Sequence, residues 1–380
     1  MAHSERCSFD LDNLSGLLLT LTALSGEFPT AQLSRLPSTD AYRQKVVKSL
    51  KGNKLLRTYY RDGLRGLRLT ASAKKQLSEQ QPDWFTPLFS GDTATSTPKY
   101  TVLGRLRLHR MAEVLVTMFN ANVLVFPWEK PALFSPTPPA AAPYIGQPIY
   151  YNSREIKEIG PQSSFIRGSR ATGVLLTDGG LFMVYNTGPS QMKWEYQSEL
   201  RLNHLLQTEI CQHRLTKQFL NVKQTPIVFG SDMEQMAPLM GVGGDGRHNY
   251  FILDGLFEHF YYLTSDHHGE LVLQLLCDTE QRAVLDDILS QDLAPRRPDW
   301  IVDNDAMDGD SPVLFAYTCD MPRIKRFNTA LGLHGKTGTL FCFDFQEKAM
   351  RQICGSGVDI QCIDFEKFER MMQEYLAAPM

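Results

Sequence analysis

A β-hairpin signal follows directly on three short helical segments, and this order of elements restricts the possible folds of the chain more than any other pattern in its sequence. Residues 54–60, KLLRTYY, and 64–70, LRGLRLT, alternate with the period of strands around Asp62 and Gly63. An Asp-Gly pair between two such runs is a strong signal for a tight hairpin turn. The residues before this hairpin repeat with the helical period instead, so the chain passes from helix to strand at this point.

The three helices are indicated by their apolar spacing and their end signals. The first has leucines at i, i+3, i+4 and i+7 intervals, namely Leu14, Leu17, Leu18, Leu21 and Leu24. Gly26 is placed to end it, a short apolar helix follows over 29–36, and Ser38 is placed to cap the third helix. Helix, helix, helix and hairpin is the element order of a winged helix-turn-helix, which we predict for residues 1–81.

The third helix, residues 38–51, separates apolar from cationic side chains at ~100° per residue. Its apolar arc consists of Tyr42, Val46, Val47 and Leu50, with Arg43 inside it. Its opposite arc consists of Ala41, Gln44, Lys45, Lys48 and Lys51. An amide and several cations on an exposed helix face suit the major groove of a DNA duplex. We therefore expect this helix to contact DNA.

The charge of the chain is concentrated in this region. Residues 35–75 contain twelve Lys or Arg and two Asp, whereas the whole chain has a net charge of −3. Such asymmetry suggests a polyanionic partner for one domain only. The hairpin arginines are expected to touch phosphates or enter a minor groove, and they are Arg57, Arg61, Arg65 and Arg68. Winged helices also mediate protein contacts, so a protein-binding adaptor stays open as an alternative.

Residues 82–148 read as a linker and a basic helix. The helix is predicted over 99–123, and its first half carries Arg105, Arg107, His109 and Arg110. These cations form either a solvated helix surface or a second element that contacts phosphate. The stretch 135–148 is rich in Pro and Ala and is expected to be extended, which makes it the preferred domain boundary.

Residues 149–380 combine hairpin patterns with strand–helix repeats. A hairpin is predicted over 171–188, and a strand–helix–strand–helix unit over 338–376 predicts two parallel strands joined by a right-handed crossover. Together with the first domain, these patterns predict the α+β class, in which an α/β domain with a mixed sheet follows the winged helix.

Acidic residues in this domain raise the possibility of metal-dependent chemistry. Asp299, Asp303 and Asp305 share one face if their segment is a strand, and they either bind a divalent ion or line a solvated edge. A nuclease of the PD-(D/E)xK layout would use Glu199, Asp299 and Asp320 to hold Mg²⁺, with Lys325 as its lysine. The acid-x-Lys element is absent, because Asp320 is followed by Met321 and Pro322. A nuclease-like core without catalysis is therefore favoured, and Mg²⁺ is expected only under the nuclease alternative.

Other sequence features bear on the cellular compartment of the protein. No apolar run reaches the ~18 residues that span a bilayer, and the first residues, MAHSERCSFD, lack the pattern of a secretory signal. The seven cysteines are scattered without a CxxC pair, which suits reduced thiols in a cytoplasm. We therefore expect a cytoplasmic protein that has no membrane partner.

The winged-helix segment, LRLHRMAEVLVTMF (106–119) and RRPDWIVDND…FAYTCDMPRIKRF (296–327) together resemble the replication-relaxation family of plasmids and integrative elements. The resemblance implies double-stranded DNA as the partner, in plasmid replication, mobilisation or conjugative transfer, and it supplies no catalytic residues. The resulting expectation is a sequence-specific DNA-binding protein of a mobile genetic element. Its C-terminal domain would bind a protein partner or self-associate.

Overall fold

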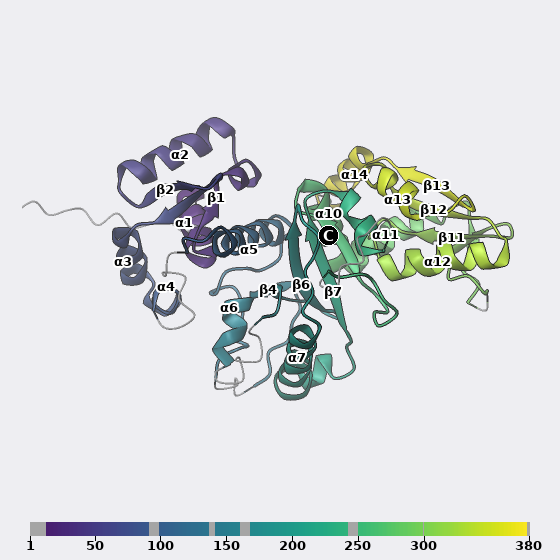
Figure 1. The fold of residues 1–380 in the computed structure, drawn as a ribbon, viewed down its shortest axis with the longest axis horizontal. Coiled ribbons are helices and arrows are strands. Elements are labelled where there is room, and N and C mark those ends of the chain that lie inside the picture. Colours follow the sequence, from purple (N-terminus) through teal and green to yellow (C-terminus); the bar gives the residue numbers. More distant parts are fainter. Residues whose placement is uncertain are drawn as a thin grey trace, which may run out of the picture. The chain divides into compact units, whose positions relative to one another are not determined.

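The computed structural model describes residues 13–90, 99–136, 141–159, 168–241, 250–298 and 300–377. The chain divides into two compact units. Unit 1 comprises Met1–Pro143 and Ile149–Ser163, and unit 2 comprises Tyr144–Pro148 and Ser164–Met380. Figure 1 shows the helices and strands of both units.

Unit 1 is built around a helix that is buried over most of its length. Its elements are α1 (Leu14–Ser25), β1 (Phe28–Pro29), the 3₁₀ helix η1 (Thr30–Arg35), α2 (Asp40–Gly52), β2 (Leu56–Arg61), β3 (Leu64–Leu69), α3 (Ala71–Gln80), α4 (Pro82–Phe89), α5 (Val102–Asn120), β4 (Ile149–Asn152), α6 (Ser153–Ile156) and η2 (Lys157–Ile159). Helix α1 is buried from Gly16 to Ser25 and packs against α5 and α2. Gly26 ends α1 in the left-handed conformation, as its position predicts.

Strands β1, β2 and β3 of unit 1 form a small antiparallel sheet of order β1-β3-β2. Strands β2 and β3 are the predicted hairpin, with Arg61 opposite Leu64 across a two-residue turn. Asp62 and Gly63 both have positive φ, at 52° and 75°, which is the backbone of a type I′ turn. This turn matches the right-handed twist of the strands, so the Asp-Gly pair fixes the hairpin register.

Unit 2 contains two sheets with mixed strand directions. Its elements are β5 (Ala171–Leu176), β6 (Leu181–Gly188), α7 (Tyr196–Leu206), the π-helix η4 (Gln207–Arg214), α8 (Thr216–Phe219), β7 (Gln224–Gly230), η5 (Met233–Gln235), α9 (Met236–Leu239), β8 (Tyr261–Thr264), α10 (His267–Cys277), α11 (Thr279–Leu289), β9 (Ala294–Pro295), β10 (Ala306–Asp308), β11 (Ser311–Phe315), α12 (Met321–His334), β12 (Gly338–Phe343), η6 (Asp344–Gln346), α13 (Glu347–Ile353), β13 (Val358–Ile363) and α14 (Phe365–Ala377).

In the first sheet β5 and β6 are antiparallel, as predicted, while β6, β7 and β8 run parallel. In the second sheet β11, β12 and β13 run parallel, and β10 and β9 extend it in antiparallel fashion. Helix α13 connects the parallel strands β12 and β13, which confirms the predicted strand–helix–strand unit (Figure 1). The α+β class with mixed sheets is thereby confirmed.

The boundaries of the units differ from the predicted domains at 1–81, 82–148 and 149–380. Helix α5 packs on α1, β1 and η1, so it belongs to unit 1 rather than to a linker region. The segment Ile149–Ser163 also groups with unit 1. The physical reason is that α5 is buried along much of its length, with Leu108, Ala112 and Leu115 among its buried residues.

Candidate nucleic-acid interface

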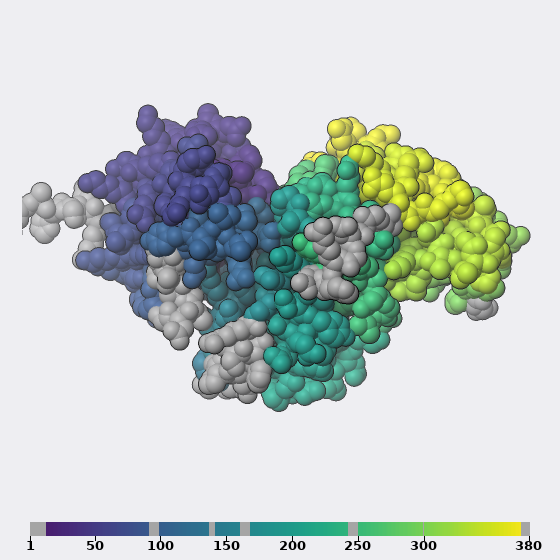
Figure 2. Space-filling view, in the orientation of Figure 1, coloured from purple at the N-terminus to yellow at the C-terminus, as the bar shows by residue number. Residues whose placement is uncertain are grey.

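Helix α2 presents the cationic face that its spacing predicts, but Tyr42, which was expected in the apolar arc, is exposed. Val46, Val47 and Leu50 are buried against the unit, whereas Ala41, Gln44, Lys45 and Lys48 are exposed and Lys51 is half-buried. The cap differs by one residue, because the Thr39 side chain, not Ser38, accepts the hydrogen bond from the backbone N–H of Tyr42. Figure 2 shows the face of unit 1 that includes the residues of α2, in purple.

The lysines of α2 carry charges that the described residues do not neutralise. Within the described part of the chain, Lys45, Lys48 and Lys51 form no ion pair with a carboxylate. Arg43, which lies inside the apolar arc, behaves differently. Its guanidinium turns back over the helix start, donates to the carbonyl of Leu36 at 2.7 Å and pairs with Asp40. The apolar arc thus tolerates this arginine because its charge is satisfied locally.

The hairpin adds three exposed cations to unit 1. Arg57 and Arg61 lie on β2 and Arg65 lies on β3, and all three are exposed. Arg61 forms a long ion pair of 3.4 Å with its neighbour Asp62, and both side chains are about half exposed. Burial and the nearby charge of Arg57 lower the pKa of Lys74 on α3. Cations crowded in this way raise the local positive potential.

Arg68, the fourth predicted hairpin contact, is not available to a ligand, which corrects the sequence interpretation. Its side chain is 6% exposed and donates to the Glu27 carboxylate at 2.6 and 2.8 Å. It also donates to the carbonyl of Lys99 at 2.6 Å, and its guanidinium carbon lies 3.9 Å from the centroid of the Tyr59 ring. Side chains alternate between the two faces of β3, so Arg68 lies on the opposite face from the exposed Arg65, in the interior, where its guanidinium requires a carboxylate.

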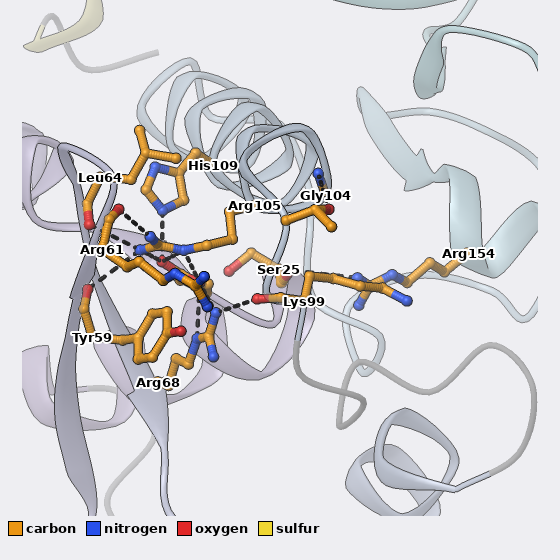
Figure 3. A network of polar contacts seen from close by, with 12 residues as sticks. Ser25, Tyr59, Arg61, Leu64, Arg68, Lys99, Gly104, Arg105, His109 and Arg154 are labelled. Atoms are coloured by element: carbon orange, nitrogen blue, oxygen red, sulfur yellow. Dashed lines mark hydrogen bonds and ion pairs between the residues drawn. The ribbon is translucent and has the colours of Figure 1, made fainter.

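Glu27 is the centre of a buried polar cluster, and Figure 3 shows its partners Arg68, Arg105 and His109. Its side chain is fully buried and receives Arg68 from β3 together with Arg105 and His109 from α5. The Oε1 atom lies 2.9 Å from Nε2 of His109, which must donate because an ionised carboxylate only accepts. Burial by itself raises the pKa of Glu27, but the hydrogen bonds from His109, Arg105 and Arg68 outweigh it and lower the pKa to about 2.

Arg105 links this cluster to the hairpin. Its guanidinium donates to the carbonyls of Arg61 at 2.8 Å, Leu64 at 3.0 Å and Tyr59 at 3.3 Å (Figure 3). Arg61 directly precedes the turn, Leu64 directly follows it, and Tyr59 lies two residues before Arg61 on β2. The side chain is 1% exposed. Helix α5 therefore holds the hairpin tip, and with it the position of the exposed arginines, relative to the core of unit 1.

The sequence interpretation missed this cluster. Arg105 and His109 are four residues apart on the buried side of α5, among Leu108, Ala112 and Leu115. Two basic side chains on an apolar helix face indicate a buried acid elsewhere, because a buried charge without a partner is costly. Glu27, isolated between α1 and β1, is that acid.

The carboxylates considered for a metal site in unit 2 have protein partners instead. Asp303 and Asp305 precede β10 rather than lying on a strand, so they do not share a strand face, and both pair with Arg323 at 3.1 and 3.0 Å. Among the described residues no group of three or more His, Cys, Asp or Glu side chains could hold a metal ion. Asp299 lies outside the described residues.

The residues considered for a nuclease site likewise form hydrogen bonds within the protein, each with different partners. Glu199 on α7 is buried and accepts from the backbone N–H of Arg170 at 2.6 Å and from the Ser169 hydroxyl at 2.8 Å. Burial raises the pKa of Glu199, and these hydrogen bonds oppose the rise.

The other two nuclease candidates also have protein partners. Asp320 lies 2.6 Å from Nδ1 of His259 and also accepts from the backbone N–H of Phe260. Lys325 donates to the carbonyl of Leu253 at 3.1 Å.

No helix in the described segments is both long and apolar enough to cross a membrane. No protein-family model, no curated protein and no solved structure matches this chain.

Proposed function

We propose that this chain is a sequence-specific DNA-binding protein and that unit 1 binds double-stranded DNA as a winged helix-turn-helix. The order α1, β1, η1, α2, β2, β3 and the sheet order β1-β3-β2 support this interpretation. In it α2 enters the major groove, and the hairpin that follows contacts the sugar–phosphate backbone or the minor groove.

One observation carries the proposal. Five cationic side chains of α2 and the hairpin are exposed and, among the residues that the structure describes, have no acidic partner outside their own turn, whereas Val46, Val47 and Leu50 of α2 are buried. They are Lys45, Lys48, Arg57, Arg61 and Arg65. Surface cations that a protein leaves without carboxylates are the groups that exchange counterions for phosphates, which is the main source of affinity for DNA.

The biological setting is proposed from the resemblance to the replication-relaxation family. A cytoplasmic protein of a plasmid or integrative element would use such a unit in replication, mobilisation or the regulation of either. Unit 2 is proposed to have a nuclease-like core without catalysis. Its role would then be to bind a protein partner or a second copy of the chain. This assignment agrees with the engagement of Glu199 and Asp320 in hydrogen bonds inside the protein.

The proposal is tested by fluorescence polarisation with labelled duplex DNA at several salt concentrations. The full chain is expected to bind with an affinity that falls steeply with salt. Replacing Lys45 and Lys48 together by Ala should weaken binding and reduce the slope of log K against log salt by about two, since each lost phosphate contact removes ~0.9.

A matched control removes two exposed lysines of unit 2, Lys217 and Lys348, which leaves the net charge equal to that of the first variant. This control should retain both the affinity and the salt slope of the unmodified protein. Equal behaviour of the two double variants, or binding that does not depend on salt, would refute the proposal and favour a protein-binding adaptor.

A further inference from the structure

We infer that α2 distinguishes DNA sequences through Gln44, which selects an adenine–thymine pair in the major groove. The inference rests on the proposed function and deepens it, because cations alone give affinity without sequence preference. A residue that specifies sequence has to offer a base edge something other than positive charge. The amide of Gln44, on the exposed face of α2, can both donate a hydrogen bond to a base edge and accept one from it.

The first step is the position of Gln44. It lies one turn into α2, which begins at Asp40 after the cap Thr39. Residues near the N-terminal end of a recognition helix are the ones that reach base edges in helix-turn-helix complexes. Gln44 stands three residues after Ala41 and four before Lys48, so the three share one row on the exposed face.

The second step is that the Gln44 amide is available. The residue is exposed, and its amide has no hydrogen-bond partner among the residues that the structure describes. Other polar side chains at the same end of the helix are in use, since Arg43 pairs with Asp40 and the Thr39 hydroxyl caps the helix. Ala41 carries only a methyl group, so the side chain on that side leaves room for a base edge to approach.

The third step is chemical. A glutamine amide has one acceptor and two donors, and it pairs in bidentate fashion with N7 and N6 of adenine. A glutamine amide contributes little to the binding of a phosphate, because it carries no positive charge that would neutralise the phosphate. The methyl group of Ala41, next along the row, suits the C5 methyl of thymine. Lys48, at the other end of the row, suits the O6 and N7 acceptors of guanine.

The test is a selection from a randomised duplex library with the full chain at fixed salt, followed by sequencing of the bound DNA. The unmodified protein should enrich a site in which one position is fixed as A·T. Gln44→Ala should lose the preference at that position alone, by roughly tenfold to a hundredfold. Gln44→Arg should replace A by G at the same position, since arginine pairs with O6 and N7 of guanine.

Lys45→Ala is the matched control, because it should weaken binding to all sequences alike and leave the enriched site unchanged. An unchanged site in Gln44→Ala overturns the assignment of Gln44 but not the proposed function. Salt-dependent binding without any enriched site overturns both the assignment of Gln44 and the proposed sequence specificity, and leaves only the binding of double-stranded DNA by unit 1. Absence of binding to any duplex refutes the proposed function itself. Circular dichroism confirms that each variant is folded, and Gln44→Arg gives a changed preference that misfolding would not produce.

Discussion

Helices α2 and α5 both belong to unit 1, and each carries several cationic side chains within a few turns. On α2, Lys45 and Lys48 are exposed, Lys51 is half-buried, and none of the three has a carboxylate partner among the described residues. On α5, Arg105 is 1% exposed and is bound to Glu27 and three backbone carbonyls. Residues of similar charge are thus accessible to a ligand in one helix and stabilise the fold of the unit in the other.

The number of cations in a segment therefore does not reveal whether their charge stabilises the fold or is available to a ligand. A buried guanidinium is compatible with the fold only if a carboxylate and further acceptors satisfy it, and removing that carboxylate leaves an unpaired charge in the interior. An exposed lysine has no such requirement, and its loss affects a bound polyanion rather than the fold. Variants of the two helices should therefore differ in stability before any DNA is added.

The largest effect is expected for Glu27→Gln. The variant keeps the shape of the side chain but leaves Arg68 and Arg105 without a buried negative charge, which should lower the free energy of unfolding of unit 1 by roughly 3–5 kcal/mol. Hydrogen exchange of peptides from α1 and β3 in increasing urea measures this for unit 1 separately. Glu79→Gln, which alters an exposed and weakly paired acid of the same unit, is the control and should change stability by less than about 0.5 kcal/mol. Equal effects would show that the buried cluster is not a stability element.

Lowering the pH should remove a similar contribution to the free energy of unfolding of unit 1. The pKa of Glu27 is about 2 in the folded state against 4.5 for an unperturbed glutamate, so its ionised form stabilises the folded state. This stabilisation is fully present above pH ~4.5 and is lost as the pH falls toward 2, by about 3 kcal/mol in total. The measurement is the free energy of unfolding of unit 1 at a series of pH values, compared with that of Glu27→Gln. Subtracting the two curves removes the other carboxyl groups, and a flat difference between pH 5 and 2 would contradict the assigned pKa.

A smaller loss is expected for Gly66→Ala on β3. A Cβ atom at this position would lie 2.3 Å from Oε1 and 2.6 Å from Cγ of Glu27, so the carboxylate would have to move away from its arginines. Overpacking of this kind costs about 1–3 kcal/mol. Gly52→Ala is the control, because nothing lies within 4 Å of its Cβ position at the end of α2. That variant should be neutral or stabilised by up to ~1 kcal/mol. If urea unfolding ranks the two variants in the opposite order, Gly66 is not required for the approach of Glu27.

Local patterns were sufficient to predict much of unit 1. The positions of Val46, Val47 and Leu50 fix the orientation of α2, and the Asp62-Gly63 pair fixes the hairpin, since both depend on neighbours in sequence. The environment of Arg68 could not be predicted in this way. It depends on β1 pairing with β3 and on a glutamate 41 residues earlier in the chain, and such long-range pairs leave no trace in local periodicity.

In unit 2, too, local periodicity did not reveal which residues pair over long distances in the sequence. Period-two spacing placed Asp303 and Asp305 on one strand face, but β10 begins only at Ala306, and Arg323 from the following helix neutralises both acids. The parallel arrangement of β12 and β13 was predictable because the strand–helix–strand order by itself restricts the topology. What a carboxylate does depends on which cation the fold brings to it, and that requires the tertiary structure.

The smallest effect is expected on α2, and it sharpens the comparison with α5. Lys48→Gln removes one cation from the exposed face, where Lys45 and Lys51 are its neighbours at i−3 and i+3. The free energy of unfolding should change by less than ~0.5 kcal/mol, with a slight gain because like charges at this spacing repel. Arg105→Gln is the matched substitution on α5, and it should lower the stability of unit 1 by several times that amount, because it leaves the Tyr59, Arg61 and Leu64 carbonyls without their donor. A stability loss for Lys48→Gln as large as that for Arg105→Gln would mean that the α2 lysines are part of the fold, and the surface proposed to bind DNA would lose its basis.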